Sequence, residues 1–296
     1  MTEKRWTIQE ILNVTTKLLK DKEIDSPRVC AEILLSHQLK KNRIELYLRL
    51  EQALTDKEIS GFRELVKRRL KREPLQYITG HREFWSIDFF VNPSVLIPRP
   101  ETELLVEEAI KLKKNRLLPE NSRPKILDLG TGSGVIAITL AKELNGATIL
   151  ATDISLEAIA TARHNAERSN VSGQIHFCNG DLLEPFQKNS ETFDMIISNP
   201  PYISSEELSI LAPEISSYEP KIALDGQENG MYFIEKIIER SSYYLKSKGW
   251  LLIEMDPGQT EKALDLIDSA QSFDFKERIM DYGKRFRLVK TQKKNG

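Results

Sequence analysis

The sequence predicts an α/β fold, in which helices cover a mostly parallel β-sheet and a small helical bundle precedes the sheet. Two patterns carry this prediction. From Lys125 onward, apolar strand-like runs alternate with helix-like segments, as in proteins built from βαβ units. Before Glu73, apolar residues recur only at helical spacing. A chain of 296 residues has room for one mid-sized domain and one small domain.

The larger domain is expected to contain seven strands. Five apolar runs predict the parallel strands, at residues 125–129, 148–153, 174–178, 193–198 and 249–255. Helices are predicted between and after these strands, at residues 133–144, 155–169, 229–246 and 258–271. The last two strands, near 275–280 and 285–290, are separated only by Asp281–Lys284. This short connection predicts an antiparallel hairpin at one edge of the sheet.

Residues 1–74 are predicted to form the helical bundle, which we interpret as a substrate-recognition domain. Thr7 with Glu10, and Thr55 with Glu58, match the capping-box pattern of a helix N-terminus. The pair Ser26-Pro27 favours another helix start, because proline is well tolerated at the first helical position. The segment contains no cluster of catalytic side chains, so we assign it binding and not chemistry.

Residues 75–100 are expected to link the bundle to the larger domain, residues 101–296. The sequence Tyr77–Gly80 predicts a turn, and residues 83–91 have the composition of a strand. We therefore expect a hairpin in the linker, with one bend at Gly80 and the other at Asn92-Pro93.

The end of this linker contains an arginine between two prolines, in Ile97-Pro98-Arg99-Pro100. The prolines stiffen the backbone and hold the Arg99 guanidinium on an extended segment. Thr102 follows and is expected to cap the next helix with its hydroxyl group. Arg99 can either contact a substrate or brace the hairpin, and we favour bracing.

The composition is that of a globular, soluble protein, with 40% apolar and 29% charged residues. No run of 18 apolar residues occurs, so no membrane-spanning helix is expected. The first residues include an acid and lack an apolar core, unlike a signal peptide. Cys30 and Cys178 lie far apart, which favours a reducing compartment and a cytoplasmic protein. The four histidines have no metal-ligand spacing, and no metal site is expected.

The net charge of −1 is unevenly distributed. Residues 1–80 contain 17 Lys and Arg against 12 Asp and Glu, and the remaining residues contain 26 against 32. We interpret the basic excess as a solvated helix face. The alternative is a docking surface for an acidic or nucleic-acid-like partner.

A rigid corner follows the fourth predicted strand, at Asn199-Pro200-Pro201-Tyr202. Neither proline can donate a backbone hydrogen bond, so the strand ends there and the carbonyls of Asn199 and Pro200 have no ladder to join. An amide side chain begins the corner and an aromatic ring ends it. Such a corner can hold a planar –NH2 group, with carbonyl oxygens accepting its hydrogens and a ring covering its face.

A second signal, Gly130-Thr131-Gly132-Ser133-Gly134, follows the first strand and opens a helix. Its glycines let the backbone approach a ligand closely. Position 135 is valine, which disfavours a dinucleotide, and no Gly-Lys-Ser/Thr follows, which excludes a P-loop. Three carboxylates, Asp128, Asp153 and Asp181, fall at strand ends on the ligand side. They suit a cationic sulfonium and ammonium better than a pyrophosphate, and so favour S-adenosylmethionine.

Taken together, these motifs resemble a known family. The residues Asp128–Gly134 with Asn199–Tyr202 resemble the Rossmann-like, S-adenosylmethionine-dependent methyltransferases of class I that methylate planar –NH2 groups. Within that group, three further stretches resemble the HemK/PrmC family: Glu73–Gly80, Ile97–Glu103, and Tyr218-Glu219-Pro220 with Ala223–Gly226. The resemblance covers nearly the whole chain.

The resemblance implies a substrate and a set of site residues. The substrate is the glutamine of the Gly-Gly-Gln motif in class 1 peptide chain release factors, and the reaction belongs to translation termination. By the same resemblance the corner, Asn199, Pro200, Pro201 and Tyr202, receives the glutamine. The cofactor is implied to lie against Asp128, Gly130, Thr131, Gly132, Ser133, Gly134, Asp153, Asp181, Leu182 and Asn199. Leu182 departs from relatives that often have an aromatic residue beside the adenine.

The residues themselves predict a mechanism based on placement. An amide nitrogen is a poor nucleophile because its lone pair is delocalised into the carbonyl. We expect the Asn199 side-chain oxygen and the Pro200 carbonyl to accept the two amide hydrogens, and Tyr202 to pack on the amide face. No dedicated general base is expected.

Two alternatives remain open from the sequence. An adenine-N6 methyltransferase acting on DNA or RNA would use the same corner, but it would need a basic cleft, and the larger domain is net acidic. A non-catalytic binding module would tolerate damage to the glycine loop, Asp153 or Asn199, and all are intact. We therefore expect a monomeric enzyme that acts on a protein, with neither a membrane nor a nucleic acid as a direct partner.

Overall fold

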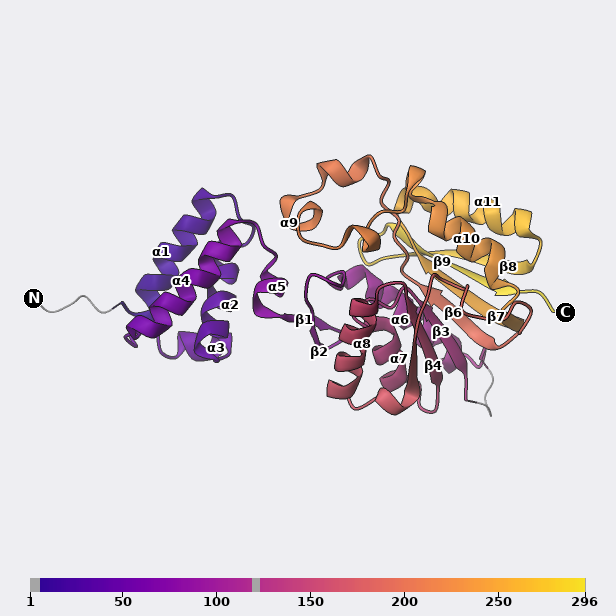
Figure 1. Ribbon diagram of the computed structural model, residues 1–296, viewed down its shortest axis with the longest axis horizontal. Coiled ribbons are helices and arrows are strands. Elements are labelled where there is room, and N and C mark those ends of the chain that lie inside the picture. The colour runs from indigo at the N-terminus through magenta and orange to yellow at the C-terminus, as the bar shows by residue number, and fades with distance from the viewer. Residues whose placement is uncertain (1–5, 119–122, 296) are drawn as a thin grey trace, which may run out of the picture. The chain divides into compact units, whose positions relative to one another are not determined.

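The computed structural model describes residues 6–118 and 123–295 (Figure 1). These residues divide into two compact units. The smaller unit comprises the described residues up to Gly80 together with Pro213–Tyr218, and the larger unit comprises His81–Ala212 and the residues from Glu219 on. The division therefore lies after Gly80, whereas the sequence predicted a separate linker at 75–100.

The smaller unit is helical, as predicted. Its helices are α1 (Ile8–Asp21), α2 (Pro27–Leu39), α3 (Arg43–Tyr47), α4 (Asp56–Leu70), α5 (Leu75–Thr79) and α9 (Pro213–Ser216). Both predicted capping boxes are confirmed, at Thr7 with Glu10 and at Thr55 with Glu58. Ser26 does precede α2, but its side chain makes no capping hydrogen bond, because its backbone is left-handed with φ of 47°.

Two features of this unit differ from the sequence prediction. Tyr77–Gly80 is not a free turn but the end of α5, and Gly80 closes that helix with φ of 77°. The segment Pro213–Tyr218 is separated by more than 130 residues from the rest of the unit, and sequence reasoning left it unassigned. Arg69 bonds Glu214 at 2.9 Å, and the Tyr218 hydroxyl donates to the Lys71 carbonyl at 2.7 Å.

The larger unit contains the predicted seven-stranded sheet. Its strands are β3 (Lys125–Leu129), β4 (Thr148–Asp153), β5 (Ile175–Asn179), β6 (Phe193–Ser198), β7 (Leu245–Glu254), β8 (Phe273–Met280) and β9 (Phe286–Lys293). The spatial order is β5-β4-β3-β6-β7-β9-β8, parallel from β5 to β7 and antiparallel beyond it. The predicted edge hairpin is thus confirmed. The parallel order brings the ends of β3, β4, β5 and β6 to one edge.

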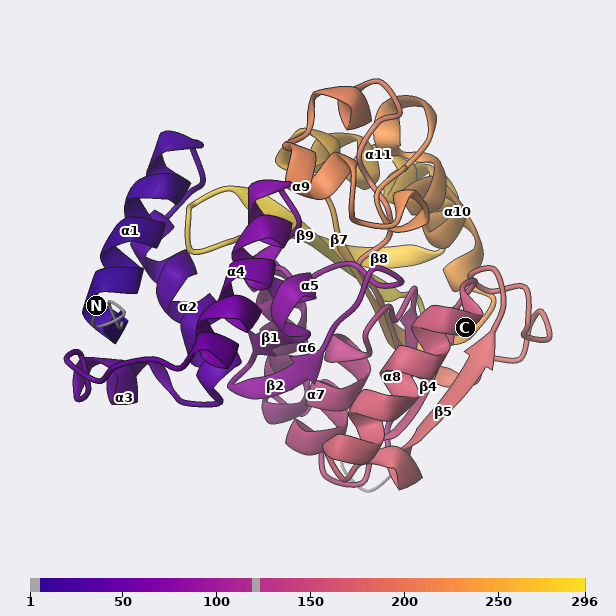
Figure 2. The ribbon, with the colours of Figure 1, turned by 60° about the vertical axis from the view of Figure 1, so that its left-hand side comes forward.

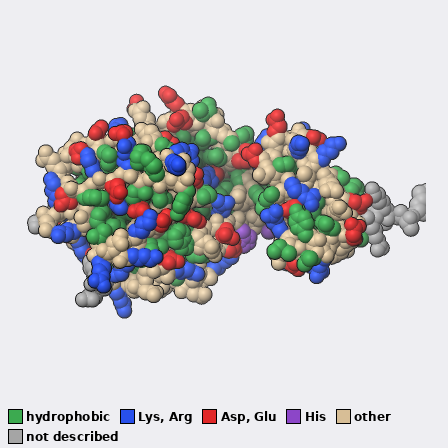
Figure 3. All heavy atoms as spheres, turned by 180° about the vertical axis from the view of Figure 1, so that it is seen from behind, with side chains coloured by type: hydrophobic (Ala, Val, Ile, Leu, Met, Phe, Trp, Pro, Cys, Tyr) green, Lys and Arg blue, Asp and Glu red, His purple; other side chains and the backbone are tan. Residues whose placement is uncertain are grey.

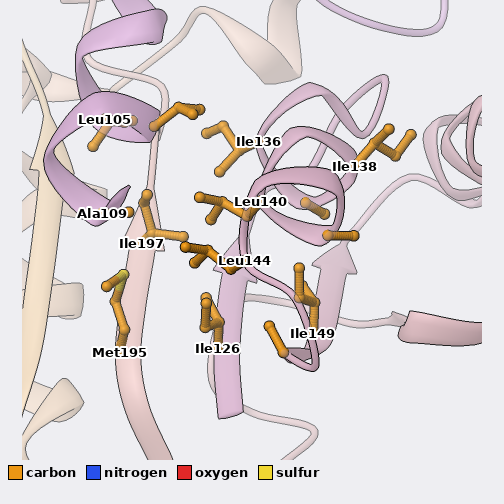
Figure 4. Packing of buried hydrophobic residues seen from close by; sticks show 14 of the residues in the cluster. Leu105, Ala109, Ile126, Ile136, Ile138, Leu140, Leu144, Ile149, Met195 and Ile197 are labelled. Atoms are coloured by element: carbon orange, nitrogen blue, oxygen red, sulfur yellow. The ribbon is translucent and has the colours of Figure 1, made fainter. Parts of the chain in front are cut away.

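Helices cover both faces of this sheet (Figure 2). They are α6 (Glu103–Lys114), α7 (Val135–Glu143), α8 (Leu156–Arg168), α10 (Tyr232–Ser241) and α11 (Thr260–Ala270). Alternate residues of each strand face opposite cores, because strand side chains alternate in direction. Ile126 packs with α6 and α7 in one core, whereas Leu127 packs with α10 and α11 in the other. Figure 4 shows Leu105, Ile136 and Ile197 meeting in the first core.

Short 3-10 helices complete the connections. They are η1 (Pro100–Thr102), η2 (Ser172–Gln174), η3 (Glu207–Ile210), η4 (Lys221–Ala223), η5 (Glu228–Gly230) and η6 (Pro257–Gln259). The predicted helix at 229–246 is shorter than expected, because β7 already begins at Leu245, which pairs with Phe193. None of the helices in the described part of the chain has the length and apolarity needed to cross a membrane.

The hairpin of the former linker region belongs to the larger unit and bends elsewhere than predicted. Its strands are β1 (His81–Phe84) and β2 (Ile87–Phe90), and the turn lies at Trp85 and Ser86, which have φ of 52° and 56°. The predicted bends at Gly80 and Asn92-Pro93 are therefore wrong. The chain reverses at Trp85 because Phe84 and Phe89 both enter the core. The strand-like composition on both sides of Trp85 and Ser86 hides this turn in the sequence.

Candidate methyl-transfer site

A cavity lies at the carboxyl edge of the parallel strands. Several predicted site residues line it together: Gly130, Gly132, Asp153, Asp181, Leu182, Asn199 and Pro201. Sequence reasoning missed its other lining residues, Ser94, Val95, Leu96, Ile154, Ser155, Ala158, Gly180, Ile222, Ala223 and Phe233. The glycine loop, the acid at the end of β4 and two residues of the corner, Asn199 and Pro201, thus share one cavity, whereas Pro200 and Tyr202 do not line it.

The three glycines of the loop have two different roles. Gly130 and Gly132 have φ of 72° and 55°, and a Cβ atom on either would meet no atom within 4 Å. They therefore provide left-handed backbone beside open space. A Cβ on Gly134 would lie 2.9 Å from Ile138 Cδ1 and 3.1 Å from Ala162 Cβ. Gly134 allows α7 and α8 to pack closely and is not a lining residue.

Asp128, Thr131 and Ser133 lie buried beneath the loop and not on the cavity wall. The Thr131 hydroxyl donates to Asp128 Oδ2 at 2.7 Å, whereas Asp128 Oδ1 has no partner among the described residues. Burial raises the pKa of Asp128 to about 7, and the hydrogen bond from Thr131 opposes that shift. These side chains support the shape of the loop from within the fold.

Asp153 lines the cavity and is fixed by the backbone. Its Oδ2 accepts a hydrogen bond from Gly132 N, and its Oδ1 accepts one from Ser155 N, both at 2.9 Å. Burial raises the pKa of Asp153, and the bonds from Ser155 and Gly132 oppose that shift. The Asn179 amide bonds the carbonyls of Asp153 and Ile154, each at 2.9 Å, and sequence reasoning missed this brace.

The segment that follows β5 contributes Asp181 and Leu182 to the cavity lining. The backbone of Leu182 is left-handed, with φ of 45°. The aromatic surface of the cavity comes from a different element, because Phe233 of α10 lines the same wall. An aliphatic Leu182 and an aromatic Phe233 are both suited to cover flat apolar surfaces of a ligand. No sequence signal marked Phe233, since it reads as an ordinary residue of an amphipathic helix.

The Asn199 amide is held at one end and open at the other. Its Nδ2 donates to the Thr102 hydroxyl oxygen at 3.0 Å. No donor among the described residues reaches Asn199 Oδ1, the Asn199 carbonyl or the Pro200 carbonyl. Two consecutive residues of the corner therefore carry three acceptors to which no described residue donates, and of these two residues Asn199 lines the cavity and Pro200 does not. Thr102 does not cap α6, contrary to the prediction, because its hydroxyl serves Asn199 instead.

Tyr202 is fixed through its backbone. Gln259 Nε2 donates to the Tyr202 carbonyl at 2.8 Å, and a Cβ on Gly230 would lie 2.2 Å from the same oxygen. Gly226 is equally close-packed, since its Cβ would lie 2.8 Å from Tyr202 Cα. Burial and the nearby Glu254 carboxyl raise the pKa of the Tyr202 hydroxyl. The sequence Gly226–Gly230, which suggested no chemistry, thus packs against the corner.

Arg99 braces the segment in front of α6. Its guanidinium bonds Glu219 Oε1 at 2.7 Å and the Ile97 carbonyl at 2.9 Å. Burial raises the pKa of the Glu219 carboxyl, and Arg99 opposes that shift. Arg99 does not line the cavity, so the structure favours the bracing role over the substrate contact.

Comparison with known proteins assigns the chain to a family. The family model of the PrmC N-terminal domain matches residues 10–80, and that of the methyltransferase small domain matches residues 104–214. The solved N-terminal domain of human METTL16, in complex with SAH, has a TM-score of 0.52 at 19% identity. The match covers 71% of this chain and 76% of that chain, and it shows the shared methyltransferase fold alone.

Two curated relatives match along nearly the whole chain. A release factor glutamine methyltransferase of Geobacter sulfurreducens is 43% identical over 269 residues, which cover 90% of this chain and 91% of the relative. One of Chlorobaculum tepidum is 40% identical over 284 residues, covering 95% and 96%. With such identity over almost its full length, the chain belongs to the release factor glutamine methyltransferase family.

Proposed function

We propose that this protein transfers a methyl group from S-adenosylmethionine to the side-chain amide nitrogen of a glutamine in a peptide chain release factor. The observation that carries the proposal is the corner at Asn199, which lines the cavity of the glycine loop and whose Oδ1 atom accepts no hydrogen bond from the described residues. A primary amide has two N–H donors and therefore complements the acceptors of this corner. Relatives named release factor glutamine methyltransferases support the choice of substrate.

The cavity residues fit the cofactor. Gly130 and Gly132 offer backbone beside open space, and Asp153 supplies a fixed carboxylate that can accept hydrogen bonds from a ribose. Leu182 and Phe233 provide apolar walls. We infer that these residues hold S-adenosylmethionine, which supplies a methyl group already activated by its sulfonium.

The role of the corner is to place the amide nitrogen and stabilise the charge that develops on it. We assign the Asn199 Oδ1 atom and the Pro200 carbonyl to the two amide hydrogens, at roughly 3 Å each. Both acceptors strengthen as positive charge grows on the nitrogen, and this is electrostatic stabilisation of the transition state. Pro200 and Pro201 keep the acceptors fixed before substrate arrives, so little reorganisation is needed.

The finer parts of the proposal follow from the family. We assign the glutamine to the Gly-Gly-Gln motif of class 1 release factors, and we assign recognition of the rest of the substrate to the helices of the smaller unit. We also infer a cytoplasmic monomer. On the face drawn in Figure 3, Lys and Arg side chains are interspersed with Asp and Glu over both units, unlike a basic face for nucleic acid.

One labelling experiment tests this function. The protein is incubated with methyl-labelled S-adenosylmethionine and one of three acceptors: a class 1 release factor, the same factor with alanine in place of the Gly-Gly-Gln glutamine, or duplex DNA. Label should appear only in the intact release factor. Label in the alanine variant would refute the choice of glutamine, and label in DNA would favour an adenine-N6 methyltransferase.

A further inference from the structure

We propose that Thr102 and Glu254 form a positioning pair that determines which end of the Asn199 amide faces the substrate. The inference rests on the proposed function, because it concerns the acceptor that Asn199 presents to the substrate amide. Neither residue lines the cavity, so both would act through Asn199. The three residues come from different elements: Asn199 follows β6, Thr102 ends η1, and Glu254 ends β7.

An asparagine side chain can present either end of its amide to a substrate. Its amide has an oxygen at one end and an NH2 group at the other, with nearly the same shape. Only the oxygen can accept a hydrogen from a substrate –NH2 group. Something must therefore hold the NH2 end away from the cavity, and Thr102 is the group that Asn199 Nδ2 contacts, at 3.0 Å.

The hydroxyl of Thr102 can donate a hydrogen bond as well as accept one. If it donated to Asn199, it would select the wrong end of the amide. Thr102 is only 2% exposed, so its hydroxyl hydrogen needs a partner within the protein. Its side chain makes no capping bond to α6, and the remaining candidate is the carboxyl group beside it, that of Glu254.

Glu254 is a buried residue at the end of β7, only 2% exposed. Neither of its carboxyl oxygens has a partner in full hydrogen-bond geometry among the described residues. The Thr102 side chain opposes the rise that burial causes in the pKa of Glu254, which makes this carboxyl group the acceptor that we assign to the Thr102 hydrogen. An ionised carboxylate only accepts hydrogen bonds, so it draws the Thr102 hydrogen to itself. The Thr102 oxygen is then left to accept from Asn199 Nδ2, and Asn199 Oδ1 faces the substrate.

The pair makes the reaction sensitive to pH. Burial raises the pKa of Glu254 to about 7, with Glu101 also raising it and Arg287 and Arg99 opposing. The Tyr202 hydroxyl is the further titratable group that Glu254 influences. A protonated Glu254 can donate to Thr102, which frees the Thr102 hydrogen for Asn199 Oδ1. The Asn199 amide then exchanges its two ends, so that its NH2 group faces the NH2 group of the substrate.

The test compares wild type with Thr102→Val, Thr102→Ser and Glu254→Gln. Thr102→Val should lower kcat by about 10- to 100-fold, as misplacement of a positioned group does, with KM for S-adenosylmethionine unchanged. Thr102→Ser should restore most of the loss. The matched control is Thr139→Val, since Thr139 is a fully buried threonine of α7 whose hydroxyl has no partner among the described residues, and this variant should keep wild-type kcat.

The pH profile separates positioning from a structural role. Wild-type kcat should fall about tenfold for each pH unit below roughly 7, whereas Glu254→Gln should lose this limb. A wild-type limb retained in Glu254→Gln, or a kcat within twofold of wild type in Thr102→Val, would overturn the pairing.

A readout that needs no turnover keeps the pairing separate from the proposed function. The side-chain NH2 resonances of Asn199, identified by their loss in Asn199→Asp, should titrate with a midpoint near pH 7 in the wild type and not in Glu254→Gln. Resonances that do not titrate would refute the pairing. Titration without methylation of a release factor would refute only the function.

Discussion

Replacing Arg99 by methionine should lower the free energy of unfolding of the larger unit by about 2 kcal/mol at neutral pH. The substitution keeps an apolar side chain of similar length and removes the cation. Among the described residues, only Ile97 N would then still donate to Glu219, through a long hydrogen bond of 3.4 Å to a residue that is 5% exposed. Full burial of such a pair would raise the cost to about 3–5 kcal/mol, but the Arg99 side chain is 29% exposed and solvent screens part of its charge.

The pH dependence of this loss follows from the raised pKa of Glu219. A carboxyl group with a folded-state pKa above its unfolded value binds a proton more tightly in the folded protein. The folded state is therefore favoured most below the ordinary value of 4.5, and stability declines as pH rises through the folded pKa. Removing Arg99 raises that pKa further. The difference between wild type and variant should thus be small at pH 4 and grow as the pH rises through the folded-state pKa of Glu219 in the variant.

Urea denaturation at pH 4 and pH 7 measures the effect, in a Trp6→Phe background where fluorescence reports Trp85 and Trp250 of the larger unit. The double variant Arg99→Met/Glu219→Gln should recover most of the loss, because it removes the unpaired charge. As a matched control, Arg168→Met breaks an exposed pair with Asp88 and should cost at most about 1 kcal/mol. A loss from Arg99→Met that is equal at pH 4 and pH 7, or one that Glu219→Gln does not relieve, would refute the reasoning.

Three further substitutions test the site. Asn199→Ala should lower kcat for release factor methylation by about 100-fold or more, while calorimetry still detects binding of S-adenosylmethionine; near-normal turnover would remove Asn199 from the mechanism. Gly132→Ala should raise the Kd for S-adenosylmethionine, because the added Cβ would project into open space beside the cavity at φ of 55°. The substitution should destabilise the fold by only about 1 kcal/mol. An unchanged affinity would contradict the assignment of the glycine loop to the cofactor. Gly230→Ala should reduce kcat more than cofactor affinity, because its Cβ would lie 2.2 Å from the Tyr202 carbonyl and displace the corner. Equal losses of kcat and of cofactor affinity would contradict this prediction.

Most of the fold could be predicted from the sequence because the buried parallel strands are continuous apolar runs. The predicted strands at 125–129, 148–153 and 193–198 match the observed bounds. The errors occur where a tertiary contact overrides the local pattern. The Trp85 turn arises inside a segment of strand-like composition because Phe84 and Phe89 both enter the same core. Strand β7 begins at Leu245, inside a predicted helix, because that residue pairs with Phe193.

The site could be predicted in part, for the same physical reason. Motifs at strand ends are local, and the strand order brings Gly130, Asp153 and Asn199 to one cavity. Partners supplied by distant elements leave no local signal. In the sequence, Phe233 has only the pattern of a helix residue. Thr102 has the pattern of a helix cap, because its hydrogen-bond partner Asn199 lies 97 positions away in the chain. Gly134 is the opposite case. It belongs to the glycine motif, but it lets two helices pack closely and does not line the cavity.

The chemistry of the corner also bears on which side chains it excludes. Asn199 Oδ1 and the carbonyls of Asn199 and Pro200 are all acceptors, so an ionised glutamate at the substrate position would oppose oxygen with oxygen. A site built to satisfy both hydrogens of an amide rejects a group that lacks them, because its acceptors would remain unpaired. This discrimination holds only while Asn199 presents its oxygen. If the amide of Asn199 turned over, the corner would offer a donor and would favour the carboxylate instead. If Asn199 receives the substrate amide as we propose, selectivity for glutamine over glutamate depends on its hydrogen bond to Thr102, outside the cavity, as much as on the atoms that touch the substrate.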